Sequence, residues 1–320
     1  MVAYDITEIA GGFAFPEGPV YLRDGSVLVT EVAGGALRRV RPDGAVELVA
    51  SLGGGVNGAA IGPDGKVYIC NNGGSVFHEH GGLLLTGTET EEFNQGENYS
   101  GGRFERVDLA TGRAEVLFRQ AGEIRLSAPN DLVFDSTGGF WATDTGKTRA
   151  RDRDRAGVLY AEPVPGATGK YLLSERIFPV NGANGIGLSP DESTLYVAET
   201  HTARLCSWDL SGPGKVLPRT THRPLRGKVL NALTDGSSFD SLAVDSEGNI
   251  AVATIGARGG ITVFDPAGRI VEFIATGDPL TTNLCFGGAD LRTAYLTCAA
   301  SGRLISLQWP VPGLALPFGA

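Results

Sequence analysis

An alternating pattern of apolar and polar positions recurs along the chain. Each copy starts with a polar or acidic residue, continues as an apolar run, passes through a polar turn that usually contains glycine, and ends in a second apolar run. Short apolar runs joined by tight turns predict β-hairpins. The six copies start at Glu17, Asn57, Asn130, Asn184, Asp240 and Asn283, which we call the anchor residues.

One or two further short apolar runs follow each copy, as in residues 37–51 after the first copy and residues 104–119 after the second. Each unit therefore supplies about four short strands in roughly 40–55 residues, which is typical of propeller blades. We expect an all-β chain in which six blades form one propeller domain over residues 1–320. A β-sandwich has no need of six similar units.

The ring of blades has to close. The sixth copy starts at Asn283 and the chain ends soon after the next apolar run, so the last blade lacks an outer strand. Residues 4–9 (YDITEI) precede the first blade and are free to supply that strand. Closure by an N-terminal strand would remove an exposed sheet edge.

Composition and charge exclude several classes of protein. The net charge is −9 and no basic patch is present, which argues against a nucleic-acid binder. No apolar run approaches the ~20 residues of a membrane span, and the N-terminus lacks the basic and apolar regions of a secretory signal. We therefore expect a cytoplasmic protein with neither nucleic acid nor membrane as a partner. Its four cysteines are expected to be buried free thiols, because none is paired as CxxC.

The anchor residues are expected at one mouth of the central channel, where the innermost strand of each blade begins. Glu17, Asn130, Asn184 and Asp240 would bring two carboxylates and two amide carbonyls to the channel axis. Such hard oxygen ligands suit Ca²⁺, and no Cys or His occupies an anchor position to favour a softer metal. Alternatively, Asn and Asp at these positions only cap strand ends and tie turns. The Asn residues that start the second and sixth copies support that alternative.

Several segments resemble motifs of the SMP-30/gluconolactonase family, also called the regucalcin-like family. The resemblance covers nearly the whole chain and implies a six-bladed propeller with a central divalent metal. The family's metal-binding Glu falls on Glu17, its two Asn positions on Asn130 and Asn184, and its Asp on Asp240. Propellers like diisopropyl-fluorophosphatase arrange a similar set. The segments are FPEGPVY from Phe15, GGVNGAAIGPDGKVYICNNGG from Gly54, PNDLVFD from Pro129, NGIGLSPD from Asn184, LYVAET from Leu195 and SFDSLAVDSEGN from Ser238.

The resemblance implies that the protein hydrolyses a small lactone with metal-activated water. Ca²⁺ is the expected ion, with Zn²⁺, Mn²⁺, Mg²⁺ and Fe²⁺ as alternatives, and it would polarise the ester carbonyl. Asp240 would accept the proton of the attacking water, and Glu17 would hold the metal. Asp131 follows Asn130, so strand alternation is expected to point it away from the channel. Sugar-lactonases of the family often carry Arg where this chain has Ala128, so a sugar-acid lactone is less well supported than lactone chemistry.

Substrate contacts are expected from Asn57 and from residues outside the strands. Residues 73–102 form the longest interval between expected strands, and loops of that length often act as lids or binding loops. Phe77, Phe93 and Tyr99 in this insertion could line a pocket. His201 is a further candidate, as a substrate contact or a base, although an ordinary loop position is the simpler reading.

Residues 145–157 contain the sequence KTRARDRDR, which is either a solvated loop of mixed charge or a cationic rim that attracts an anionic substrate. Two other functions use the same architecture. The cation could serve a phosphotriesterase or aryl-esterase, or it could be structural in a propeller without catalytic activity. A nucleophile at Ser241 is not favoured, because no G-x-S-x-G motif is present.

Overall fold

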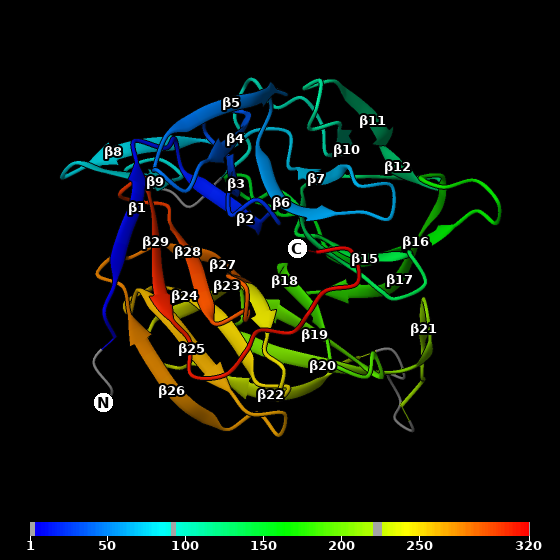
Figure 1. Ribbon diagram of the computed structural model, residues 1–320. Helices are drawn as coiled ribbons and strands as arrows, with labels where there is room; N and C mark the ends of the chain where they lie inside the picture. The colour runs from blue at the N-terminus through cyan, green and yellow to red at the C-terminus, as the bar shows by residue number, and fades with distance from the viewer. Residues whose placement is uncertain (1–3, 91–93, 220–225, 320) are drawn as a thin grey trace.

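The computed structural model describes residues 4–90, 94–219 and 226–319. In this part of the chain, strands are linked by turns and loops, and six antiparallel sheets stand around a central channel as the blades of a propeller (Figure 1). Each of the six sequence copies supplies the two innermost strands of one blade, so the predicted fold class is confirmed. No helix in the described ranges is long and apolar enough to cross a membrane.

The blades share one pattern, in which four strands run from the channel to the rim. The fourth blade has a further strand, β22 (Lys228–Ala232), that pairs with β20. From the channel outward, the blades are β2 (Pro16–Tyr21), β3 (Val27–Glu31), β4 (Ala36–Val40) and β5 (Val46–Ser51); β6 (Val56–Ile61), β7 (Val67–Asn71), β10 (Arg103–Val107) and β11 (Ala114–Phe118); β14 (Pro129–Phe134), β15 (Phe140–Asp144), β16 (Ala156–Pro163) and β17 (Tyr171–Val180); β18 (Ala183–Leu188), β19 (Thr194–Glu199), β20 (Arg204–Gly212) and β21 (Lys215–Val216); β23 (Ser237–Val244), β24 (Ile250–Gly256), β25 (Gly260–Phe264) and β26 (Ile270–Ala275); β27 (Thr281–Gly287), β28 (Thr293–Cys298), β29 (Arg303–Gln308) and β1 (Thr7–Gly11). A small ladder of β12 (Gln120–Ala121) and β13 (Ile124–Arg125) links the second and third blades.

An N-terminal strand closes the ring, as predicted. β1 pairs antiparallel with β29, with Thr7 opposite Ser306 and Gly11 opposite Arg303. The strand starts three residues later than the expected segment 4–9. The reason is that Ile9 and Ala10 pack beside Leu304 and Val40, where the sixth blade meets the first.

Every inner strand carries a register shift close to its anchor residue. The shifts lie between Glu17 and Val20 in β2 and between Pro129 and Leu132 in β14, for example, and the other four inner strands repeat them. A β-bulge of this kind redirects side chains and bends the strand. The bend brings neighbouring inner strands very close, because a Cβ on Gly18 would lie 2.5 Å from the carbonyl oxygen of Asn57. Glycine is therefore required at position 18, where φ is also +44°.

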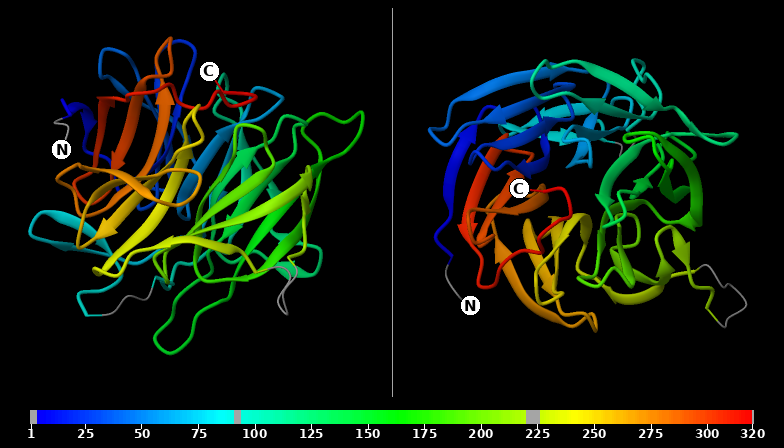
Figure 2. Two further views of the ribbon diagram at one scale, coloured as in Figure 1. Left: turned by 90° about the horizontal axis from the view of Figure 1, so that it is seen from below. Right: turned by 45° about the vertical axis from the view of Figure 1, so that its right-hand side comes forward.

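The two mouths of the channel differ. The inner strands begin at the anchor mouth, which also carries the long loops 72–102 and 145–155. The opposite tail mouth is crossed by residues 310–319, where Leu314 N donates to Val244 O at 3.0 Å. The side view in Figure 2 shows this red C-terminal segment and the cyan insertion on opposite faces of the disc.

The insertion of the second blade contains a hairpin that was not expected from the sequence. β8 (Phe77–His80) pairs with β9 (Leu83–Thr86). Leu84 N donates to Ala300 O of the sixth blade at 2.9 Å, and the Phe77 ring lies 5.0 Å from the ring of Phe15. The hairpin therefore bridges from its own blade to the junction of the sixth and first blades.

Candidate functional site

The anchor residues form a buried ring at one end of the channel. Each lies at or near the start of an inner strand, and none is more than 9% exposed. Neighbouring inner strands contact one another around the channel, including the first and the last. Six polar side chains are thus held at equivalent positions of six converging strands.

Glu17 is fixed by two hydrogen bonds to the same carboxylate oxygen. Its Oε2 accepts from Gly18 N at 2.7 Å and from Asn283 Nδ2 at 2.8 Å. Burial raises the pKa of Glu17, and these two hydrogen bonds act in the opposite direction. The second carboxylate oxygen, Oε1, takes part in neither bond.

Asp240 and Asn184 lie together on the other side of the ring. Burial raises the pKa of Asp240 well above its ordinary value, and the negative charge of Glu17 raises it further. A hydrogen bond from the Asn184 side chain opposes this shift. Asn184 Nδ2 is also 3.0 Å from Thr200 Oγ1, which holds the amide in place.

Asp131 lines the channel next to the ring, so the expectation that it points away from the channel was wrong. Alternation fails at this point because the register shift in β14 spans Pro129 to Leu132. Burial and then the charge of Glu17 raise the pKa of Asp131 to about 8. The structure therefore adds a channel carboxylate that simple alternation had excluded, and the sequence carries no signal for the bulge that redirects it.

The ring fits a cation by two independent observations. The side-chain oxygens Oδ1 of Asn57 and Asn130 are buried and have no hydrogen-bond partner, which costs about 1–3 kcal/mol per group unless a ligand uses it. Glu17, Asp131 and Asp240 take part in none of the ion pairs formed by the described residues. A site with buried carboxylates and unpartnered amide oxygens has the donor set that Ca²⁺ prefers.

Within the described ranges, no three or more His, Cys, Asp or Glu side chains form a group that could hold a metal without other ligands. The four predicted ligands include only two carboxylates, and the other two are amides. The ring is therefore a candidate cation site because of its amide oxygens as much as because of its carboxylates.

The other predicted contacts lie on separate loops of the anchor mouth. The Phe77 ring packs at a tilt against the ring of Phe15 at the edge of the insertion. The Tyr99 hydroxyl donates to Ser127 O at 2.6 Å, so it fastens the insertion to the third blade. His201 is exposed in the turn after β19, and its ring lies over Gly182. Phe93 lies outside the described residues.

The charged loop 145–157 is tied to the insertion. The Lys147 ammonium is 1% exposed and donates to Gly74 O at 2.7 Å and to Ser75 Oγ at 3.3 Å. Burial lowers its pKa to about 7, while the charges of Asp144 and Asp154 act in the opposite direction. Lys147 thus holds the base of the insertion, a role that its place in a charged run did not reveal.

We expect Lys147→Met to loosen the insertion. The variant loses the charge-assisted hydrogen bonds to residues 74 and 75, each worth about 1.5–3 kcal/mol. Backbone amides of residues 74–87 should then exchange hydrogen about tenfold faster, as measured by mass spectrometry. Lys170→Met, at an exposed lysine, is the control. Unchanged exchange in the Lys147 variant would show that other contacts hold the insertion.

Comparisons with known proteins agree with this architecture. The family model described as SMP-30/Gluconolactonase/LRE-like region matches residues 15–300. A gluconolactonase from Zymomonas mobilis is 27% identical over 311 residues, covering 89% of this chain and 77% of that protein. Lactonase drp35 from Staphylococcus epidermidis is 30% identical over 286 residues, covering 87% of this chain and 73% of that protein.

A solved structure has the same fold. It is regucalcin from Agrobacterium tumefaciens, described as a calcium-binding protein, and it superposes with a TM-score of 0.71 at 18% identity, covering 99% of this chain and 97% of that one. At this level of identity the likeness shows the fold alone.

Proposed function

This chain belongs to the SMP-30/gluconolactonase/LRE-like family, and on that premise we propose that it hydrolyses a small lactone at the anchor ring, with a divalent cation held there. Relatives named gluconolactonase and lactonase support the lactone as the substrate class. The observation that carries the proposal is the set of buried carboxylates and unpartnered amide oxygens around one end of the channel.

Glu17, Asn130, Asn184 and Asp240 would hold the cation, and Asp131 would add a further carboxylate beside them. When bound, the cation polarises the ester carbonyl and stabilises the negative charge that develops on its oxygen. Ca²⁺ is our preferred ion, because every proposed donor is an oxygen.

Asp240 would accept the proton of the attacking water. Its carboxylate is buried beside Glu17, and both features make it a better proton acceptor than a carboxylate in water. A general base works best when its pKa is close to the operating pH. Asn184 orients this carboxylate through its side-chain hydrogen bond.

Glu17 has a different role, since Gly18 N and Asn283 Nδ2 both hold its Oε2. A carboxylate fixed in this way is suited to keeping a ligand position constant. The aromatic residues Phe77 and Tyr99 of the insertion would then line the approach to the ring and reduce its contact with water.

A substrate panel tests this function. The purified protein is assayed with δ-gluconolactone, an alkyl lactone, a phosphotriester and phenyl acetate, each with and without EDTA and corrected for spontaneous hydrolysis. We expect hydrolysis of lactones, loss of activity in EDTA, recovery with Ca²⁺, and one bound ion per chain by elemental analysis. Faster hydrolysis of the phosphotriester or the aryl ester would show that the protein catalyses a different reaction. Lactone hydrolysis at the same rate with and without EDTA would show that the reaction does not need the cation.

A further inference from the structure

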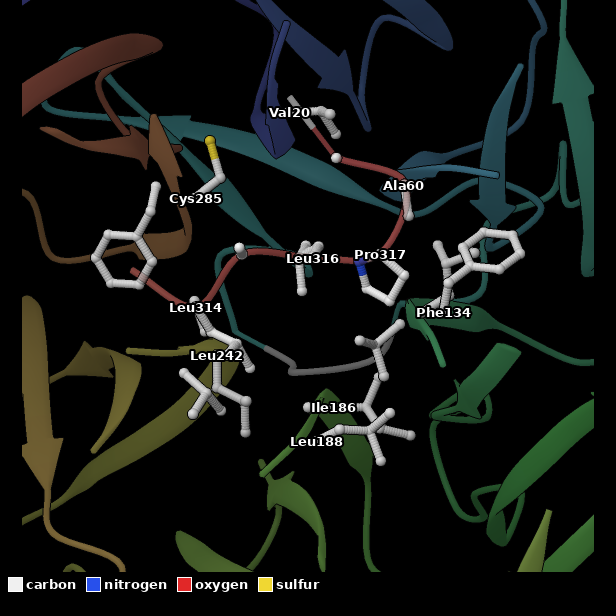
Figure 3. A pocket seen from close by; sticks show the side chains of 18 of the residues that line it. Val20, Ala60, Phe134, Ile186, Leu188, Leu242, Cys285, Leu314, Leu316 and Pro317 are labelled. Atoms are coloured by element: carbon white, nitrogen blue, oxygen red, sulfur yellow. The ribbon is translucent and has the colours of Figure 1, made fainter. Parts of the chain in front are cut away.

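A second cavity lies between the anchor ring and the tail mouth. It has a volume of about 180 Å³ and is bounded by the inner strands of the blades and by residues 314–319 (Figure 3). Figure 3 shows Val20, Ile186, Leu188 and Leu242 around this space, with the C-terminal segment crossing it. The cavity adjoins the anchor ring at one end, and the C-terminal segment bounds it on the side away from the anchor mouth.

The walls of this cavity are more apolar than polar. Its polar side chains are Asp131 and Asn283 at the ring end and Tyr21, Ser189, Glu192 and Cys285 elsewhere. Small residues at three equivalent positions of the inner strands, Ala60, Gly187 and Ala243, help to leave this space open. Water fills the apolar part of such a space poorly, because a buried water needs two to four polar partners.

The C-terminal segment covers the cavity with few directional contacts. Gly313 N donates to Leu291 O at 2.8 Å and Leu314 N to Val244 O. Beyond residue 314, the Phe318 ring lies edge-on to Phe134 at 5.8 Å, and the Leu316 side chain is 53% exposed. Apolar packing therefore holds most of the C-terminal segment over the cavity, and a ligand can replace such packing.

We infer that this cavity is a second binding site, for one small uncharged apolar molecule of about six to eight non-hydrogen atoms. Apolar cavities of about 150 Å³ stay dry and bind benzene, so a space of 180 Å³ suits a molecule of that size. A sugar-like ligand is unsuited, because its hydroxyls would lose hydrogen bonds to water without replacement. The ligand enters at the tail mouth and does not compete with a lactone at the anchor mouth.

Cys285 offers a reporter inside this site. All four cysteines are free; Cys285 is half-buried and lines the cavity, whereas Cys70, Cys206 and Cys298 are buried. Methyl methanethiosulfonate converts a thiolate to its methyl disulfide and releases methanesulfinate. The rate at which Cys285 is modified, followed by peptide mass spectrometry, therefore measures access to the cavity.

The test uses benzene as the probe on the full chain. We expect one benzene to bind per chain by calorimetry, at least a fivefold slower modification of Cys285 in saturating benzene, and no change in the KM for a lactone. Ala60→Phe should fill the cavity and abolish benzene binding, while Ala110→Phe, in an exposed turn, should leave it unchanged. Removal of residues 314–320 should weaken benzene binding at least tenfold and speed the modification of Cys285.

Three results would overturn the inference. One is the absence of saturable benzene binding to the wild-type chain, which would mean that the cavity holds water. Another is competitive inhibition of lactone hydrolysis by benzene, which would show that benzene binds at the anchor mouth. The third is modification of Cys285 at the same rate with and without benzene, a measurement that needs no variant and does not depend on how Ala60→Phe folds.

Discussion

Replacing Asp240 by Asn is expected to lower the rate of lactone hydrolysis by about 10²–10⁴-fold at saturating cation. The amide keeps the shape of the side chain and an oxygen that can bind a metal, but it cannot accept a proton at neutral pH. Cation affinity should also fall, because a negative charge is lost from the ring. The assay must therefore follow kcat as the cation is raised to saturation.

Glu17→Gln provides the contrast. Glu17 is proposed only to hold the cation, so its variant should bind the ion more weakly and recover most of its turnover in excess ion. Asp209→Asn is the matched control, because Asp209 is exposed on β20, the third strand of its blade. Near-normal turnover of the Asp240 variant at saturating cation would show that Asp240 binds the cation but is not the general base. The base would then be sought first at His201, on the rim of the same mouth.

The cation-free protein is expected to lose thermal stability as the pH rises from 6 to 9. Burial and the charge of Glu17 raise the pKa of Asp131 from 3.8 to about 8, so the folded chain holds this proton more tightly than the unfolded chain. The resulting stabilisation is present at low pH and is lost as the pH passes through about 8. The pKa values of Glu17 and Asp240 are raised in the same direction. We expect the melting temperature in EDTA to fall by on the order of 5–10 °C.

Added Ca²⁺ should reverse most of this loss, because a cation stabilises the ionised ring. Lys147 has a lowered pKa and acts in the opposite direction, so the contribution of the ring has to be isolated by a variant. Asp131→Asn should flatten the dependence of the melting temperature on pH in EDTA. If the melting temperature in EDTA depends on pH in the same way in this variant and in the wild type, Asp131 does not contribute to that dependence.

The fold could be predicted because each copy of the repeat consists of short, local sequence patterns. The turns between inner strands and their partners carry an aspartate that binds a backbone amide two residues later, as Asp64 does with Lys66 and Asp245 with Glu247. Such turns form from neighbouring residues, so sequence reasoning could count the blades. The position of β1 depended instead on packing against Leu304 and Val40, and its predicted start was therefore three residues too early.

The site was harder to predict, because a bulge reverses the direction of every later side chain. Asp131 was excluded by simple alternation, and only the pairing of β14 with β15 shows the extra residue. The hairpin of the insertion was missed for a related reason. Its strands gain their packing from Phe15 and Ala300, which are distant in the sequence.

The closure of the ring also bears on how the chain is made in the cell. Thr7 and its partner Ser306 lie 299 residues apart, and ribosomes add about 5–20 residues per second. The first strand of the protein therefore waits roughly 15–60 s for its partner. During that time the strand is an unpaired edge that could join with another nascent chain. The sequence TEIAG limits this hazard, since it is short and ends in glycine.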